Sequence, residues 1–218
     1  LIQLAIAVGG GTLLHRFVIA PDQDSSHFRL ECYYLLIIGF ELFQLFFVLY
    51  GIRKTQTSMA NLISGQWASI GSVVKDLFIG LAFWFLCLIV ISVVTKAFGL
   101  HLQPSSDVRA MLPRTGTEIV LWMVLSVSAG FSEEVVYRGY LQRQFLALGK
   151  NLPLAIVGQA IVFGLIHSYQ GLGHVLAISV MGALFGLLAV WRKSLRPGII
   201  AHMWIDGFTG TVAYLLRN

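Results

Sequence analysis

Ionisable side chains stand at helical spacing inside three apolar stretches of the C-terminal half. The patterns are Glu133-Glu134-x-x-x-Arg138, Phe163-x-x-x-His167 and His202-x-x-x-Asp206. A charged group at membrane depth costs at least about 2.5 kcal/mol on insertion scales, so such groups persist for a structural or chemical reason. A carboxylate beside a partly desolvated imidazole can deprotonate water, and a second imidazole can bind a metal or donate to an oxyanion. The patterns therefore indicate hydrolytic chemistry.

The spacing of the first pattern predicts which groups pair. Glu134 and Arg138 are i and i+4 on one helix, so they share a face and are expected to form an ion pair. Glu133 is rotated by about 100° from Glu134 and is free to face a different neighbour. Phe163 with His167, and His202 with Asp206, share faces for the same reason.

Depth along the helices tests whether the groups can meet. Measured from the short connection at 148–152, Glu133 and His167 each lie fourteen residues in, about 21 Å at 1.5 Å per residue. These two can sit level. His202 lies five residues after Pro197, roughly 7 Å, so the last helix must tilt or start late to bring it to the same level.

The composition requires a lipid environment for the elements that carry these residues. Of the 218 residues, 57% are hydrophobic and 11% charged, against roughly 25% charged in soluble domains. The fold class is therefore predicted as all-α, a polytopic transmembrane bundle of about six to seven helices. The predicted spans are 33–52, 77–98, 117–147, 153–170, 174–191 and 198–216, with a further candidate at 1–20.

The basic residues are scattered between the apolar runs, which argues against a nucleic-acid partner and for topology signals. Strict alternation of the spans puts eight Lys and Arg on the side that includes Arg53, Lys150 and Arg192, and five on the other. The richer side is expected to be cytoplasmic. We expect one multi-pass domain over 1–218, in the cell inner membrane, with lipid as its surroundings.

The three motifs resemble the CAAX protease and bacteriocin-processing family of intramembrane proteases, also called the abortive-infection family. The resemblance covers 117–216, which would be the catalytic core. It implies an intramembrane endopeptidase that acts on a peptide or protein substrate, lipidated in some members.

The resemblance also implies roles for the motif residues. Glu133 and His167 would activate the attacking water, and His202 with Asp206 would stabilise the oxyanion. Glu134 and Arg138 would hold the site together, with Phe163 in support. Many family members carry Asn where this chain has Asp206, and an Asp donates a hydrogen bond only when protonated or through His202.

The cofactor expectation is none, with zinc as the alternative. The family has been described as zinc-dependent, and the set Glu133, His167 and His202 is compatible with zinc. The metal-free glutamate mechanism is preferred because the sequence offers Glu134 and Asp206 alone as carboxylates in a second shell.

Two other functions are kept as alternatives: a proton-coupled transporter, since intramembrane acids and imidazoles also build proton relays, and a non-catalytic immunity or scaffold protein of the same fold. The motif residues could also be solvated or interfacial groups with no catalytic role. Glu41, Gln44 and His174 are interpreted as structural or interfacial residues. Gly182 and Gly186 are interpreted as a close-packing face.

Overall fold

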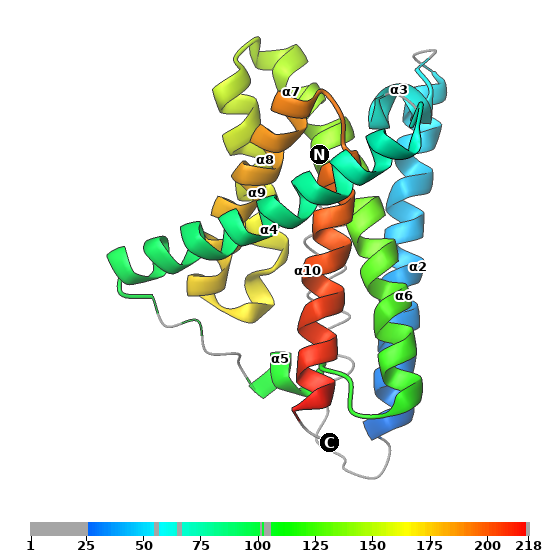
Figure 1. Ribbon diagram of the computed structural model, residues 1–218, viewed down its shortest axis with the longest axis vertical. Coiled ribbons are helices and arrows are strands. Elements are labelled where there is room, and N and C mark those ends of the chain that lie inside the picture. The colour runs from blue at the N-terminus through cyan, green and yellow to red at the C-terminus, as the bar shows by residue number, and fades with distance from the viewer. Residues whose placement is uncertain (1–25, 55–56, 65–66, 101, 103–105, 217–218) are drawn as a thin grey trace.

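Apolar runs of the sequence form long helices arranged as a bundle (Figure 1). A computed structural model describes residues 26–54, 57–64, 67–100, 102 and 106–216, and no strand occurs among them. Helices are the expected solution in lipid, because each backbone donor and acceptor is satisfied within its own segment. The candidate span at 1–20 lies outside the described residues.

Each of the six main predicted spans overlaps one long helix. These helices are α2 (Ser26–Arg53), α4 (Ile70–Ala97), α6 (Gly116–Glu133), α8 (Leu152–Ile166), α9 (Leu172–Arg192) and α10 (Arg196–Leu215). The shorter elements are α3 (Met59–Ile63), α5 (Ser106–Ala110), η1 (Glu134–Leu141), α7 (Gln142–Gly149) and η2 (Ser168–Gln170). The all-α polytopic fold class is therefore confirmed.

Among the described residues, four helical stretches are long and apolar enough to span a membrane: Phe28–Arg53, Ile70–Ala97, Gly116–Gly149 and Leu172–Arg192. Helix α8 has 15 residues, about 22 Å, which is shorter than the roughly 30 Å of hydrocarbon in a bilayer. Helix α10 carries Arg196, His202 and Asp206 among its apolar residues and is not one of the four.

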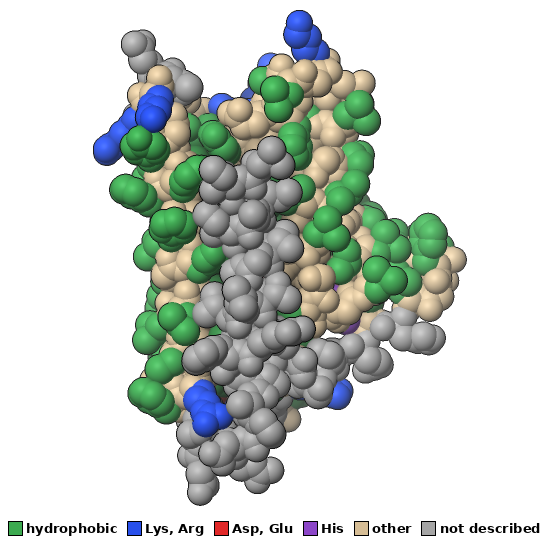
Figure 2. Space-filling model, turned by 180° about the vertical axis from the view of Figure 1, so that it is seen from behind, with side chains coloured by type: hydrophobic (Ala, Val, Ile, Leu, Met, Phe, Trp, Pro, Cys, Tyr) green, Lys and Arg blue, Asp and Glu red, His purple; other side chains and the backbone are tan. Residues whose placement is uncertain are grey.

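The outer surface is apolar along the length of the helices. Figure 2 shows hydrophobic side chains covering the sides of the molecule, with Lys and Arg gathered near its ends. Phe78 and Phe46 are typical, with 71% and 65% of their surfaces exposed. A soluble protein rarely leaves so continuous an apolar surface in water, so this surface faces lipid.

The helices that carry the three motifs pack directly on one another. Helix α6 lies between α2 and α10, and α8 packs along α9. Helix α4 crosses α10 at a steep angle (Figure 1). Val48, Val135, Phe163 and Ile199 meet in the core between these elements.

The connection from α9 to α10 explains how His202 reaches the interior. Lys193 ends α9 in the left-handed conformation, and the buried Leu195 donates its backbone N–H to the Ile63 carbonyl at 3.0 Å. Helix α10 consequently begins below the level at which α9 ends (Figure 1). The late start that the depth of His202 required is therefore present.

Candidate active site

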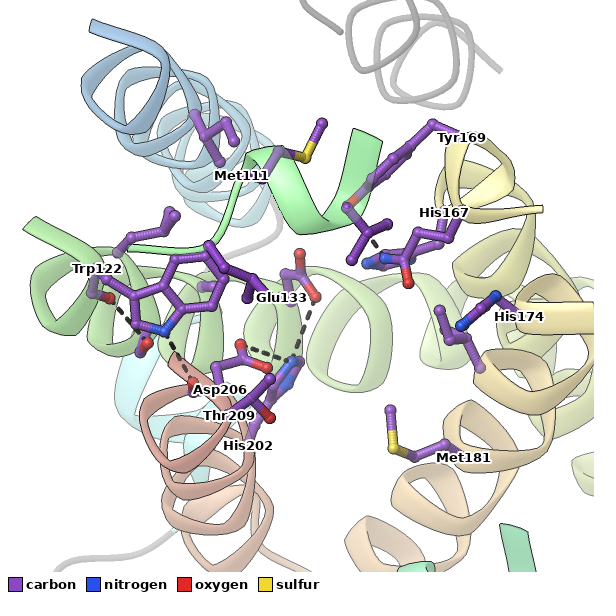
Figure 3. A pocket seen from close by; sticks show the side chains of 18 of the residues that line it. Met111, Trp122, Glu133, His167, Tyr169, His174, Met181, His202, Asp206 and Thr209 are labelled. Carbon is purple, nitrogen blue, oxygen red and sulfur yellow. Dashed lines mark hydrogen bonds and ion pairs between the residues drawn. The ribbon is translucent and has the colours of Figure 1, made fainter. Parts of the chain in front are cut away.

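The His202 imidazole lies at the centre of the site and contacts three carboxylates. Its Nδ1 is 3.1 Å from Glu134 Oε1, and its Nε2 is 3.6 Å from both Glu133 Oε2 and Asp206 Oδ2. Figure 3 shows the Glu133 and Asp206 contacts at the wall of a cavity. The first and third motifs, separated by more than sixty residues, are therefore brought together.

A π-helical stretch allows two adjacent glutamates to approach the same imidazole ring, that of His202. The continuous helix from Gly116 to Gly149 changes from α to π geometry between Glu133 and Glu134. We had expected Glu133 to face a different neighbour from Glu134; instead the two approach opposite nitrogens of His202. π-helical turns are rare and frequently occur at functional sites, and no periodicity in the sequence signals this one.

The ion pair predicted from the i, i+4 spacing is present and buried. Arg138 Nη1 donates to Glu134 Oε1 at 2.9 Å, and Nη2 donates to the Gly182 carbonyl at 3.3 Å. The guanidinium also lies over the ring of Phe163, 4.3 Å from its centroid, and near that of Phe185 at 5.1 Å. Removing one partner of such a buried pair costs about 3–5 kcal/mol, so these contacts fix Glu134 in place.

Glycines allow the helices to approach closely enough for these contacts. A Cβ on Gly130 would lie 2.7 Å from the Met203 backbone nitrogen. The backbones of α6 and α10 therefore approach closely at this point, which is one turn before Glu134. A Cβ on Gly182 would lie 3.2 Å from Ala160 Cα. The close-packing role expected for Gly182 is observed, and its carbonyl also accepts a hydrogen bond from Gln159 Nε2 at 2.9 Å.

His167 faces the same cavity from the end of α8. The predicted helix over 153–170 ends earlier, because Ile166 is the last residue of α8 and a 3₁₀ turn follows. His167 Nδ1 lies 2.8 Å from the Phe163 carbonyl oxygen, which can only accept, so Nδ1 carries the proton and Nε2 is left free. No hydrogen bond joins His167 to a carboxylate in the described part of the chain.

A cavity of about 390 Å³ connects these groups. Glu133, His167, His202 and Asp206 share its wall with aromatic and apolar side chains (Figure 3). The apolar and aromatic lining includes Tyr33, Tyr34, Ile37, Met111, Trp122, Leu125, Ile178 and Met181. A concave apolar pocket with a few convergent polar groups is the usual form of a ligand site.

Several lining residues were not identified as site residues from the sequence. Trp122 donates its indole N–H to the Asp206 carbonyl at 2.8 Å and so ties α6 to α10. Tyr34 donates its hydroxyl to the Met111 carbonyl at 2.6 Å. Glu41 and His174, interpreted as structural or interfacial, also line the cavity. An acidic residue inside an apolar span was the available signal for Glu41.

The zinc alternative does not fit this arrangement. Across the described ranges, no three His, Cys, Asp or Glu side chains are grouped so that they could hold a metal ion. We therefore derive no step through a metal.

Fold and site together define a helical integral membrane protein with acid and imidazole groups around an internal cavity. Residues 115–208 match the family model described as Type II CAAX prenyl endopeptidase Rce1-like. The matched part runs from the N-cap of α6 into α10, and the match confirms the family resemblance of the motifs. Comparisons with curated proteins and with solved structures returned no match.

Proposed function

We propose that this protein is an intramembrane endopeptidase that hydrolyses a peptide bond with a water activated by Glu133 and His167. The observation that supports it best is the meeting of Glu133, Asp206 and His202 on the wall of a cavity that His167 also lines. The match to an endopeptidase family over 115–208 supports the same reaction class.

The reaction would proceed by general base catalysis. Glu133 takes a proton from water while His167 Nε2 holds the same water, and the resulting hydroxide attacks the peptide carbonyl carbon. The carbonyl oxygen becomes an oxyanion, which His202 stabilises from Nε2 with the help of Asp206. Collapse of the tetrahedral intermediate breaks the C–N bond, and Glu133 returns its proton to the leaving amine.

The hydrogen bonds of the two imidazoles suit these roles. Glu134 lies at Nδ1 of His202 and the Phe163 carbonyl lies at Nδ1 of His167. In both rings Nδ1 therefore faces a fixed acceptor. Nε2 of His167 is left for water, and Nε2 of His202 points to the cavity wall, where it lies 3.6 Å from Glu133 and Asp206. The Arg138 contact holds Glu134 in turn, so the ion pair has a positioning role.

The substrate class follows from the cavity and its surroundings. The apolar wall around Tyr34, Met111 and Leu125 suits a peptide segment with apolar or lipidated side chains, delivered from the membrane. We propose the cell inner membrane as its location, because its long apolar helices suit a bilayer that holds helical proteins.

Paired variants test the proposal. Glu133→Gln and His167→Ala should each remain folded in detergent and lose cleavage by at least about a hundredfold, as expected for general base catalysis. Glu31→Gln is the matched control, because Glu31 stands on α2 and does not line the cavity. Wild-type cleavage by both site variants would rule out water activation by Glu133 and His167. Ion or solute flux in proteoliposomes, with no cleavage by the unmodified protein, would favour the transporter alternative.

A further inference from the structure

Glu41 is a buried acid that the proposed reaction does not use. It lies near the middle of α2, outside the family match at 115–208, and only 4% of its surface is exposed. Helix α2 packs against α6, and Glu41 lines the same cavity as Glu133 and Asp206.

The Glu41 carboxyl group has no counterion among the described residues. Its Oε2 accepts no hydrogen bond of standard geometry there, although the Ser128 side chain lies close enough to interact with the carboxyl group, and no Lys, Arg or His forms an ion pair with it. The other acids of the site are matched: Glu134 by Arg138, and Glu133 and Asp206 by His202. Glu41 thus presents an unused acceptor at the cavity wall.

The cavity as a whole favours positive over negative ligands. Three carboxyl groups and three histidines line it, and the described lining contains no Lys or Arg. A buried carboxylate without a partner is costly, and an arriving cation with hydrogen-bond donors would remove that cost. The apolar side chains near Glu41, such as Ile37 and Leu125, suit the alkyl stem that precedes a basic head group.

We propose that Glu41 is a specificity-determining residue that accepts a hydrogen bond from a Lys or Arg side chain of the peptide close to the scissile bond. The same carboxyl group disfavours an acidic side chain at that position. This inference rests on the proposed endopeptidase function and names a property of its substrate.

Matched peptides measure the effect. A mixed-sequence peptide library, digested by the purified full chain in lipid vesicles and read by mass spectrometry, first locates cleavage sites. Peptides that differ in one flanking residue, Lys, Gln or Glu, then give ratios of kcat/KM. We expect the wild type to prefer Lys over Gln by roughly tenfold or more, as for a hydrogen bond between charged groups.

Substitutions that remove or reverse the charge of Glu41 should change the kcat/KM ratios of these peptides in different ways. Glu41→Gln should bring the Lys-to-Gln ratio close to one while cleavage of the Gln peptide continues. Glu41→Lys should shift the preference to the Glu peptide. Glu31→Gln, the same change of charge on the same helix away from the cavity, should keep the wild-type ratio.

The outcomes separate this inference from the proposed function. An unchanged Lys-to-Gln ratio in a folded Glu41→Gln variant overturns the role of Glu41, while cleavage that depends on Glu133 still stands. Undiminished cleavage of all peptides by Glu133→Gln overturns the proposed function itself. If Glu41→Lys fails to fold, as judged by its melting in detergent, the isosteric Glu41→Gln variant decides alone.

Discussion

The orientation of His202 follows from the groups on its two nitrogens. Glu134 lies 3.1 Å from Nδ1 and is itself held by Arg138 at 2.9 Å, so the ring is tied to a buried ion pair. Nε2 is directed towards Glu133 and Asp206 at the cavity wall. A ring that is fixed before substrate arrives can stabilise developing charge without reorganisation, which is the main source of electrostatic catalysis.

Asp206 stands at a motif position where the family pattern has Asn or Asp. We predict that Asp206→Asn keeps kcat within about tenfold, because an amide N–H can donate directly to the oxyanion. Asp206→Ala should lower kcat by about a hundredfold or more, the usual cost of losing one oxyanion donor. Steady-state cleavage assays of both variants measure this.

The comparison between these two variants is the informative part. A small effect of both substitutions would remove Asp206 from the oxyanion-stabilising group. Equal and large losses would instead indicate that the negative charge of Asp206, and not a hydrogen bond donated by it, supports His202.

At the scale of elements, the crossing of α6 and α10 sets the distance between the glutamates and His202. The crossing is close because Gly130 faces the backbone of Met203, and because Gly198 leaves room for Glu134, whose Oε2 would lie 3.1 Å from an added Cβ. The π-helical stretch that begins at Glu134 then turns both acids towards α10. Site geometry thus depends on small residues that do no chemistry.

We predict that Gly130→Ala damages both stability and activity. The added Cβ would lie 2.7 Å from the Met203 nitrogen, so α6 and α10 must separate. Overpacking of this kind costs about 1–3 kcal/mol, and catalysis is sensitive to displacements of about 1 Å. Thermal unfolding in detergent and kcat/KM should both fall.

Gly116→Ala is the matched control on the same helix, because a Cβ there meets no atom within 4 Å. This substitution should be neutral or slightly stabilising, since Ala is a better helix former than Gly by up to about 1 kcal/mol. A Gly130→Ala protein with wild-type melting and turnover would show that the contact between α6 and α10 can relax without cost.

At the scale of the whole molecule, the apolar surface and the basic ends define how the bundle lies in a bilayer. Exposed residues such as Phe46 and Phe78 cover the sides of the helices, and Lys and Arg gather near the ends. Charges that are buried in such a bundle interact more strongly than charges at a soluble surface.

The predicted orientation can be measured with single cysteines. In a background with Cys32 and Cys87 replaced by Ser, Lys150→Cys should resist a membrane-impermeant maleimide in intact bacterial cells, and Lys96→Cys should react. Both lysines are exposed, and the distribution of basic residues places Lys150 on the cytoplasmic side. Labelling of Lys150→Cys but not of Lys96→Cys would reverse the assigned topology.

Much of this protein could be predicted from local features of the chain. Apolar runs of about twenty residues located the helices, since lipid requires helical backbone, and the i, i+4 spacing of Glu134 and Arg138 correctly predicted their ion pair. The motifs likewise identified the family of 115–208. These features depend on residues close together in sequence, so composition and spacing are enough to determine them.

The tertiary structure alone decided how distant segments meet. The π-helical register at Glu134, the low starting point of α10 and the place of Glu41 at the cavity each depend on packing between helices. A periodic pattern indicates which face of a helix is apolar, but it does not fix which neighbour covers that face or at what height. The neighbouring helix and its height are decided by contacts between residues far apart in the chain. Close packing of side chains, together with small residues that let helices approach, selects one arrangement.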